Sequence, residues 1–205
     1  MDIKLNFINE SNDTNDSQIV IFQKNVAAAS EAQTIAWLVI QHCGVGDNHP
    51  FTFPMTMQVA GGDSWGNFTP RLNAEPGQMY AMSRTSSGDT LQFHGPATNP
   101  AEVQVLNALP RGAISANIYK AGRLLACKTS IAPQEIAAFE FRPTLWIGVV
   151  SEAVEGEVID AAVFSTVNTE ISLLGISSAD IVMTGGGPGP ESRPFTFSLA
   201  NVKMA

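Results

Sequence analysis

The segment Gly62-Asp63-Ser64-Trp65-Gly66 matches the pattern G-x-S-x-G, which can carry a nucleophilic serine. In α/β-hydrolases this pattern forms a sharp turn between a strand and a helix, with the serine exposed. Here the segment 67–77 contains two prolines and no helical spacing of apolar residues, so the required helix is missing. We interpret the segment as a polar turn that holds a partly buried Trp65. A hydrolase that uses Ser64 remains an alternative.

The three histidines are the next candidates for catalysis or metal binding. His42, His49 and His94 each lie near the end of a predicted strand or in a loop. No H-x-H, H-x₃-H or H-E-x-x-H spacing places two of them on one element, so only the fold could gather them with Asp47 or Asp63. A metal-dependent enzyme that uses this histidine set is the second enzymatic alternative.

Two loops are rich in side-chain oxygens, which are the atoms that calcium prefers. They run from Glu10 to Asp16 and from Gly46 to Asn48. Neither has the spacing of an EF-hand loop with its glycine and terminal glutamate. We interpret both as solvated turns and expect no cofactor, with calcium as the one cation that these loops leave open.

The glycine-rich loop Gly185–Pro190 resembles a phosphate cradle only in composition. It lacks the Gly-Lys-Ser/Thr ending of a P-loop, and no helix is predicted after it. Its two prolines also remove backbone N–H donors. We expect a connector before the last strand.

The first residues of the chain and the two cysteines indicate the cellular compartment in which the protein is expected. The first residues alternate between apolar and polar types and have neither the basic start nor the apolar core of a secretory signal. The expected location is therefore the cytoplasm, with non-classical release as the other route. In a reducing compartment, Cys43 and Cys127 are expected to be free thiols rather than a disulfide.

The charge balance excludes some classes of partner. The 205 residues include 11 basic and 19 acidic side chains, which gives a net charge of −8 with only 15% charged residues. Between Arg142 and Arg193 there is no Lys or Arg. Nucleic acid needs a basic surface, so we expect no nucleic-acid partner. No apolar run is long enough for a transmembrane helix, and the sparsely charged surface predicts a homo-oligomer or self-assembly.

The predicted elements are short strands, because apolar runs with period-two alternation are separated by Gly, Pro, Asn, Asp and Ser. The clearest is a hairpin over 113–130, in which Gly122 supplies the positive φ of the turn. The sequence therefore predicts an all-β fold, an antiparallel β-sandwich of many short strands with at most one short helix. The other predicted strands are 2–8, 18–23, 34–42, 51–60, 78–83, 90–94, 102–107, 135–142, 145–151, 158–164, 167–174, 180–183 and 194–203.

Two segments also have helical features. The residues Ser30-Glu31-Ala32-Gln33 have the spacing of a capping box, but the following 35–40 are largely β-branched and aromatic, which favours a strand. The segment 151–175 is the second place where a short helix would fit.

One domain over 1–205 is expected, with two packed β units as the alternative arrangement. The sub-units would then be 1–108 and 113–205, on either side of the Pro/Gly connector 107–112. A faint echo between the segments 49–54 and 193–198, which both contain Pro-Phe-Thr-Phe, favours two units.

The leading functional hypothesis is a non-enzymatic binding or self-assembling protein that acts through strand faces, loops or edges. The candidate binding residues are Asp47, His49, Asp63, Trp65 and His94. The second hypothesis is a membrane-active, pore-forming or host-targeting toxin-like protein with membrane-surface contact. It rests on the alternating, Ser/Thr-rich region 164–184.

Overall fold

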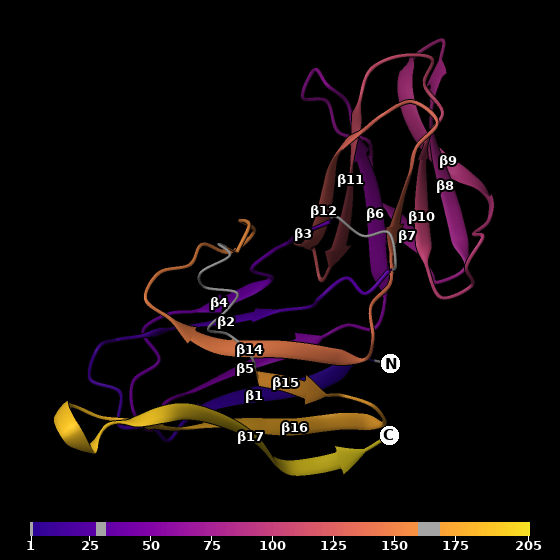
Figure 1. Cartoon of the computed structure of the whole chain (residues 1–205). Helices are drawn as coiled ribbons and strands as arrows, with labels where there is room; N and C mark the ends of the chain where they lie inside the picture. Colours follow the sequence, from indigo (N-terminus) through magenta and orange to yellow (C-terminus); the bar gives the residue numbers. More distant parts are fainter. Residues whose placement is uncertain (1, 28–31, 160–168) are drawn as a thin grey trace. The chain divides into compact units, whose positions relative to one another are not determined.

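The computed structural model describes residues 2–27, 32–159 and 169–205 (Figure 1). These residues form seventeen strands and one short 3₁₀ helix, η1 (Gly189–Glu191). They divide into two compact units: unit 1 comprises 1–23, 35–55 and 143–205, and unit 2 comprises 24–34 and 56–142. The prediction of an all-β sandwich fold with at most one short helix is confirmed.

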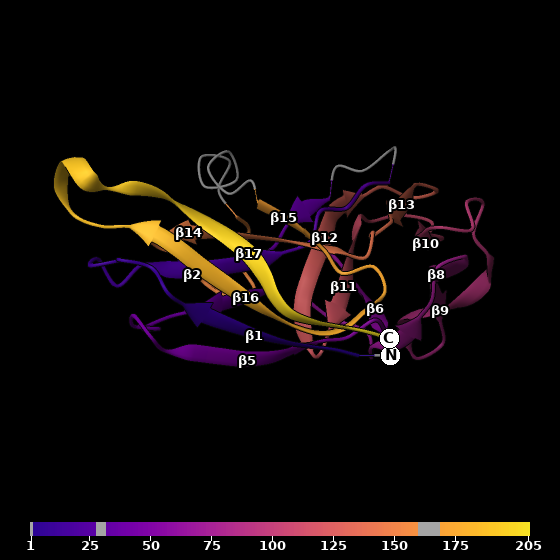
Figure 2. The same ribbon diagram turned by 90° about the horizontal axis from the view of Figure 1, so that it is seen from below.

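Unit 1 consists of two four-stranded sheets, which lie as two layers in Figures 1 and 2. In the first sheet β1 lies in the interior, parallel to β16 and antiparallel to β5. In spatial order this sheet contains β17 (Arg193–Met204), β16 (Ile176–Gly186), β1 (Ile3–Asn9) and β5 (Asn48–Phe53). The second contains β15 (Thr169–Ser172), β14 (Thr144–Val150), β2 (Gln18–Phe22) and β4 (Leu38–Ile40).

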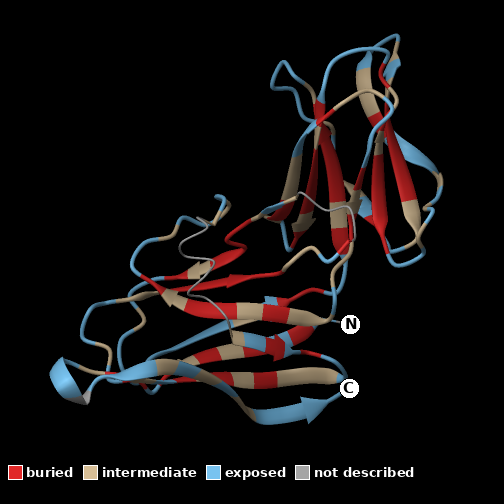
Figure 3. Cartoon of the chain, in the orientation of Figure 1, coloured by how far each residue is buried: buried red, intermediate tan, exposed pale blue. Residues whose placement is uncertain are grey.

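The core of unit 1 follows from strand alternation. Along β1, Ile3, Leu5 and Phe7 are buried, because every second side chain points to the same face of the sheet. Trp37 is also fully buried and packs edge-to-face against Phe53, with ring centroids 5.3 Å apart. Figure 3 shows the buried residues of the strands in red.

Unit 2 also consists of two sheets, one of four strands and one of five. Both contribute fully buried branched side chains to its core, among them Val59, Val103 and Ile118. The first sheet contains β13 (Ile136–Phe139), β10 (Val103–Asn107), β8 (Gln78–Thr85) and β9 (Gly88–Pro96). The second contains β3 (Gln33–Thr34), β12 (Arg123–Ile131), β11 (Ile114–Lys120), β6 (Met57–Gly62) and β7 (Leu72–Ala74).

The predicted hairpin over 113–130 is confirmed as β11 and β12. Its two-residue turn has positive φ at both positions, 49° at Ala121 and 77° at Gly122. Positive φ at both central residues is what a tight hairpin needs to match the twist of its strands.

Two of the predicted strands are interrupted, both where the chain passes from one unit to the other. The predicted strand 34–42 divides into β3, in unit 2, and β4, in unit 1. The predicted strand 51–60 divides in the same way into β5, in unit 1, and β6, in unit 2. A continuous apolar run, 35–40, spans the first break, and period-two alternation spans the second, so neither pattern reveals that the partner strands change.

The bounds of the two units differ from the sub-units 1–108 and 113–205 of the sequence hypothesis. The segment 107–112 lies inside unit 2 as the loop between β10 and β11. The two Pro-Phe-Thr-Phe segments lie in β5 and β17, at opposite edges of one sheet of unit 1, so the echo does not relate unit 1 to unit 2.

The two helix candidates have different outcomes. Residues 35–40 are not helical, in agreement with the preference for a strand, whereas residues 28–31 lie outside the described part of the chain. Within 151–175, residues 151–159 and 169–175 contain no helix, and residues 160–168 lie outside the described part.

Candidate functional site

The loop after β6 is held by the side chain of Asp63. Its Oδ1 accepts hydrogen bonds from the backbone N–H of Trp65 (2.8 Å) and of Asn67 (2.9 Å), and its Oδ2 accepts one from Nδ2 of Asn67 (2.9 Å). These bonds, above all those from Asn67, lower the pKa of Asp63 from its ordinary value. The carboxylate therefore fixes the shape of the loop, as an Asx turn does.

Trp65 projects from this loop into solvent. Its exposure is 85%, so the expectation of a partly buried Trp65 is wrong, although the polar turn itself is present. The neighbouring Phe68 is 66% exposed, and its ring lies over Gly62, where an added Cβ would approach to 2.9 Å. The apolar residues of this loop therefore lie on the surface of unit 2, where they are available for contact.

A second loop, 108–112, lies beside the same surface and is held by a buried asparagine. Asn107 is fully buried; its Nδ2 donates to the carbonyls of Gly112 and Ile131, both at 2.9 Å, and its Oδ1 accepts from the N–H of Leu109 at 3.0 Å. Gly112 has a φ of +91°, which favours glycine. This loop carries the exposed Arg111.

These two loops and the β8–β9 hairpin surround a cavity of about 320 Å³ in unit 2. Arg84 and Asp89 come from the hairpin and form a paired contact, with Nε–Oδ1 at 2.7 Å and Nη2–Oδ2 at 3.0 Å. The hydrogen bond to Asp89 raises the pKa of Arg84, and the same bond lowers the pKa of Asp89. The other residues that line the cavity include Trp65, Leu109 and Arg111.

Ser64 lines the same cavity, but its surroundings differ from those of a catalytic serine. The loop leads from β6 to β7 rather than into a helix, so the strand–turn–helix geometry of the hydrolase pattern is not formed. Within the described part of the chain, Ser64 has no hydrogen bond to a histidine. Ser64 therefore contributes a polar hydroxyl group to the wall of the cavity.

The structure places the three histidines on separate elements. His42 is exposed in a loop of unit 1, and its Nδ1 lies 2.6 Å from Oδ2 of Asp16. His49 lies exposed on β5 of unit 1, and His94 lies exposed on β9 of unit 2. Among the residues that the structure describes, no group of three or more His, Cys, Asp or Glu side chains could hold a metal ion.

The two oxygen-rich loops do lie side by side in unit 1. The N–H of Asn9 donates to the carbonyl of Asp47 at 3.0 Å, and the N–H of Gly46 donates to the carbonyl of Asn9 at 2.7 Å. The carboxylates, however, serve their own loops: Asp13 accepts from Asn15 and Ser17, and Asp47 accepts from the N–H of Gly44. These carboxylate oxygens therefore mainly accept hydrogen bonds from the backbone and side chains of their own loops.

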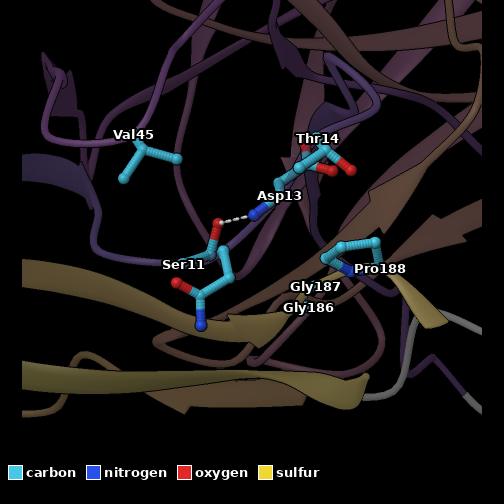
Figure 4. Close-up of a pocket in the computed structure, with 8 residues that line it drawn as sticks. Ser11, Asp13, Thr14, Val45, Gly186, Gly187 and Pro188 are labelled. Carbon is cyan, nitrogen blue, oxygen red and sulfur yellow. Dashed lines mark hydrogen bonds between the residues drawn. The ribbon is translucent and has the colours of Figure 1, made fainter. Parts of the chain in front are cut away.

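A cavity of about 460 Å³ lies between the first of these loops and the glycine-rich segment that follows β16 (Figure 4). Ser11, Asp13 and Thr14 line one side, Gly186 to Pro188 line the other, and Val45 completes the wall. The N–H of Asp13 donates a hydrogen bond to Oγ of Ser11 (3.1 Å), so two of the lining residues are joined to each other. No Lys or Arg is among the described residues that line this cavity, so a phosphate would meet a carboxylate without a cation.

The glycine-rich segment is a tight bulged connection between β16 and β17. A Cβ on Gly186, where φ is +76°, would lie 2.5 Å from the ring of Phe195. A Cβ on Gly185, where φ is +92°, would overlap the carbonyl oxygen of Pro194. The expected connector is therefore present, and close packing against Pro194 and Phe195 determines its shape.

The outer edge of β17 is a further candidate contact surface. β17 pairs with β16 on one side and forms the end of its sheet. Its residues 194–202 carry no charge, and its side chains are exposed or half-buried. The opposite edge of the same sheet is β5, where Pro50 lies opposite Asn6 of β1.

The region 164–184, which motivated the membrane-active hypothesis, contains β15 and most of β16; residues 164–168 lie outside the described part. β16 is an interior strand that pairs with both β1 and β17. No helix of the described residues is long and apolar enough to cross a membrane.

The two cysteines are free and half-buried. Burial raises the pKa of both thiols, and at Cys43 the charge of Asp47 adds to this effect. A raised pKa reduces the thiolate fraction at neutral pH, so neither cysteine has the environment of an activated nucleophile.

Of the predicted binding residues, the structure brings Asp63 and Trp65 together at one cavity, whereas Asp47 and His49 lie in unit 1 and His94 lies outside the cavity lining. Sequence reasoning missed Arg84, Asp89 and Arg111. The spacing of Arg84 and Asp89 around the predicted turn at 87–89 could have indicated their pairing. Comparison of the chain with protein-family models, with curated proteins and with solved structures gave no match.

Proposed function

We propose that this chain is a non-enzymatic self-assembling protein in which two copies join along the outer edges of their β17 strands. The observation that carries the proposal is that the outer edge of β17 is unpaired. One side of β17 is paired with β16, and the other side has no partner strand among the described residues. An unpaired strand edge presents N–H and C=O groups to which another strand can add.

The sequence of β17 suits strand addition. The nine residues from Pro194 to Val202 carry no charge, and they include Phe195, Phe197 and Leu199, which are half-buried on the sheet. Aromatic and branched side chains favour strands. Natural edge strands are commonly protected by inserted lysines or prolines, and the run from Phe195 to Ala200 contains neither.

The regular part of the edge is limited by two irregularities. Residues Thr196–Ala200 pair with β16 without a break in register, and register shifts occur on both sides of this run. On one side Asn201 has a φ of +49°, which is typical of a bulge that turns the strand away from a flat sheet. A partner strand is therefore expected to pair over about five residues rather than along all of β17.

A pair of β17 strands is favoured over the pairing of β17 with β5 of another copy. Pro50 in the middle of β5 has no N–H to donate, which weakens that edge as a template. Pairing of β17 with β5 would join copies head to tail into rings or open filaments, whereas pairing of β17 with itself gives a closed two-fold dimer. The proposed assembly is therefore a dimer with antiparallel β17 strands.

The test is the molar mass in solution over a range of protein concentrations. Sedimentation velocity and light scattering should show a monomer that converts to a dimer as the concentration rises to the high micromolar range. Because each copy carries a net charge of −8, added salt should strengthen the association. A single monomeric species at high micromolar concentration would overturn the proposal.

A charged residue on the edge should separate this interface from others. Ser198 is exposed in the middle of the regular run, so Ser198→Lys should prevent the dimer and leave the monomer folded. The matched control is Gln92→Lys, which places the same charge at an exposed position of the edge strand β9. Loss of the dimer with the control and not with Ser198→Lys would place the interface elsewhere and would contradict the proposal.

A further inference from the structure

We propose that the cavity beside Trp65 in unit 2 binds an acidic saccharide, with the indole stacked on a sugar ring and Arg111 paired with its carboxylate. This inference is independent of the dimer, because it concerns other residues and another unit of the chain. It rests on three features: an exposed aromatic ring on a fixed loop, an unpaired cation, and a cavity of small-molecule size.

The first feature is the exposure of Trp65 on a loop of fixed shape. Burying an indole is favourable, so a tryptophan with 85% exposure is available surface rather than core. Its loop is tied by the three hydrogen bonds to the carboxylate of Asp63 and by the backbone pairing of Gly62 with Phe68. A rigid, exposed aromatic ring loses little conformational entropy when a ligand packs on it.

The second feature is the distribution of charge around the cavity. Arg84 is already paired with Asp89, and the oxygens of Asp63 accept three hydrogen bonds within their own loop. Arg111 is exposed and has no hydrogen bond or ion pair within the described part of the chain. A guanidinium is suited to a carboxylate because its N–H groups can donate two parallel hydrogen bonds.

The third feature is the shape and polarity of the cavity. Its volume of about 320 Å³ is at the lower end of small-molecule sites, which suits a mono- or disaccharide unit. The buried Leu109 offers an apolar floor, and the hydroxyl of Ser64 offers a hydrogen-bonding group. A pyranose ring has an apolar C–H face for an indole and hydroxyl groups for polar neighbours, so it matches both kinds of wall.

The two loops that carry the recognition groups are preorganised independently. Asp63 holds the loop that carries Trp65, and the buried Asn107 holds the loop that carries Arg111. The recognition groups thus lie on loops whose conformation is set by hydrogen bonds within unit 2. A ligand would therefore find its aromatic and cationic partners already in place.

The test uses trigalacturonate and its fully methyl-esterified form, which share the sugar rings and differ in charge. Isothermal titration should show binding of the acid and at least about tenfold weaker binding of the ester, because charge-assisted hydrogen bonds are stronger than neutral ones. Equal binding of the two forms would overturn the role of the carboxylate. Binding of neither form would overturn the proposal as a whole.

Variants of the chain identify the site of binding. Trp65→Ala and Arg111→Gln should each weaken binding of trigalacturonate by about tenfold or more. Matched controls are Phe93→Ala, which removes another exposed ring of unit 2, and Arg71→Gln, which removes an arginine that contacts Tyr119 and the Gly122 carbonyl instead. Binding that survives both site variants, or that is lost equally in the controls, would contradict the assignment.

Discussion

Arg84 and Asp89 face each other across the β8–β9 hairpin, with two contacts of 2.7 Å and 3.0 Å between guanidinium and carboxylate. The Asp89 side chain is 9% exposed and that of Arg84 is 51% exposed. The pair joins the two strands at one end of the hairpin and contributes to the wall of the Trp65 cavity.

This pair predicts an acid-dependent loss of stability. Because the hydrogen bond from Arg84 lowers the pKa of Asp89, the folded state favours the carboxylate more than the unfolded chain does. The resulting stabilisation is present above the ordinary pKa of 3.8 and is lost as the pH falls through the lower folded value. Asp89→Asn should therefore reduce the urea midpoint at neutral pH, and its difference from the unmodified chain should shrink in acid. A difference that stays constant with pH would count against this explanation.

Lys120 predicts a further rise of stability with pH, this time in alkaline solution. It lies at the end of β11 with 4% exposure, and burial lowers its pKa from 10.5 to about 8. Between these values the unfolded chain keeps a proton that the folded chain has lost, so the free energy of unfolding rises with pH. Between about pH 8 and pH 10 the rise should be on the order of 2 kcal/mol.

The measurement for Lys120 is denaturant unfolding of the unmodified chain and of Lys120→Met at a series of pH values from about pH 8 to pH 10. The contribution of Lys120 is the difference in stability between the unmodified chain and Lys120→Met, because the buried thiols of Cys43 and Cys127, whose pKa burial raises, act in the opposite direction in both chains. This difference should change by about 2 kcal/mol between pH 8 and pH 10. If the difference between the two chains does not change with pH, the charge of Lys120 is not suppressed by burial.

Two glycine-to-alanine substitutions in the glycine-rich connection are predicted to reduce stability by different amounts. Gly186→Ala places a methyl group 2.5 Å from the ring of Phe195 on β17, at a φ of +76°. Gly189→Ala introduces the same kind of backbone strain at a φ of +70°, with no heavy atom within 4 Å. The Gly189 variant should therefore lose about 1 kcal/mol of stability and the Gly186 variant clearly more. Thermal unfolding of both variants makes the comparison, and equal losses would show that packing on Phe195 contributes nothing.

The oxygen-rich loops predict insensitivity to calcium. Since the Asp13 carboxylate already accepts from the N–H of Asn15 and from both the N–H and the hydroxyl of Ser17, neither excess calcium nor EDTA should change the thermal midpoint. Asp13→Asn keeps one acceptor oxygen and loses the bond that Oδ2 accepts from the N–H of Ser17, so it should lower the stability by about 1 kcal/mol. A midpoint that rises with calcium in the unmodified chain, and not in Asp13→Asn, would establish a site in this loop.

The alternation of apolar and polar residues is sufficient to predict most strands. In β1 it places Leu5 and Phe7 on the buried face, and in the hairpin it needs only Gly122 to locate the turn. The strands at 34–42 and 51–60 are predicted as continuous because an apolar run or an alternating pattern indicates which residues are buried and not which sheet the strand joins. The division between the units occurs within those two segments.

The candidate site was predicted in part for a similar reason. Asp63 and Trp65 are close in sequence, so their turn could be identified from residue type. Arg111 is distant from Trp65 in sequence, and only the pairing of β11 with β6 brings their loops to one surface. The exposure of Trp65 was also not predictable, because local sequence does not show whether an apolar partner lies nearby.

The parallel pairing of β1 with β16 has a consequence for how the chain is made. Asn6 of β1 pairs with Asp180, which lies 174 positions later, so the first strand of unit 1 cannot complete its sheet until most of the chain has left the ribosome. Most of unit 2, residues 56–142, is synthesised during that interval and has all but one of its strands in one continuous segment. Unit 2 is therefore expected to fold first during translation, while β1 has only β5 available as a partner and waits for β16.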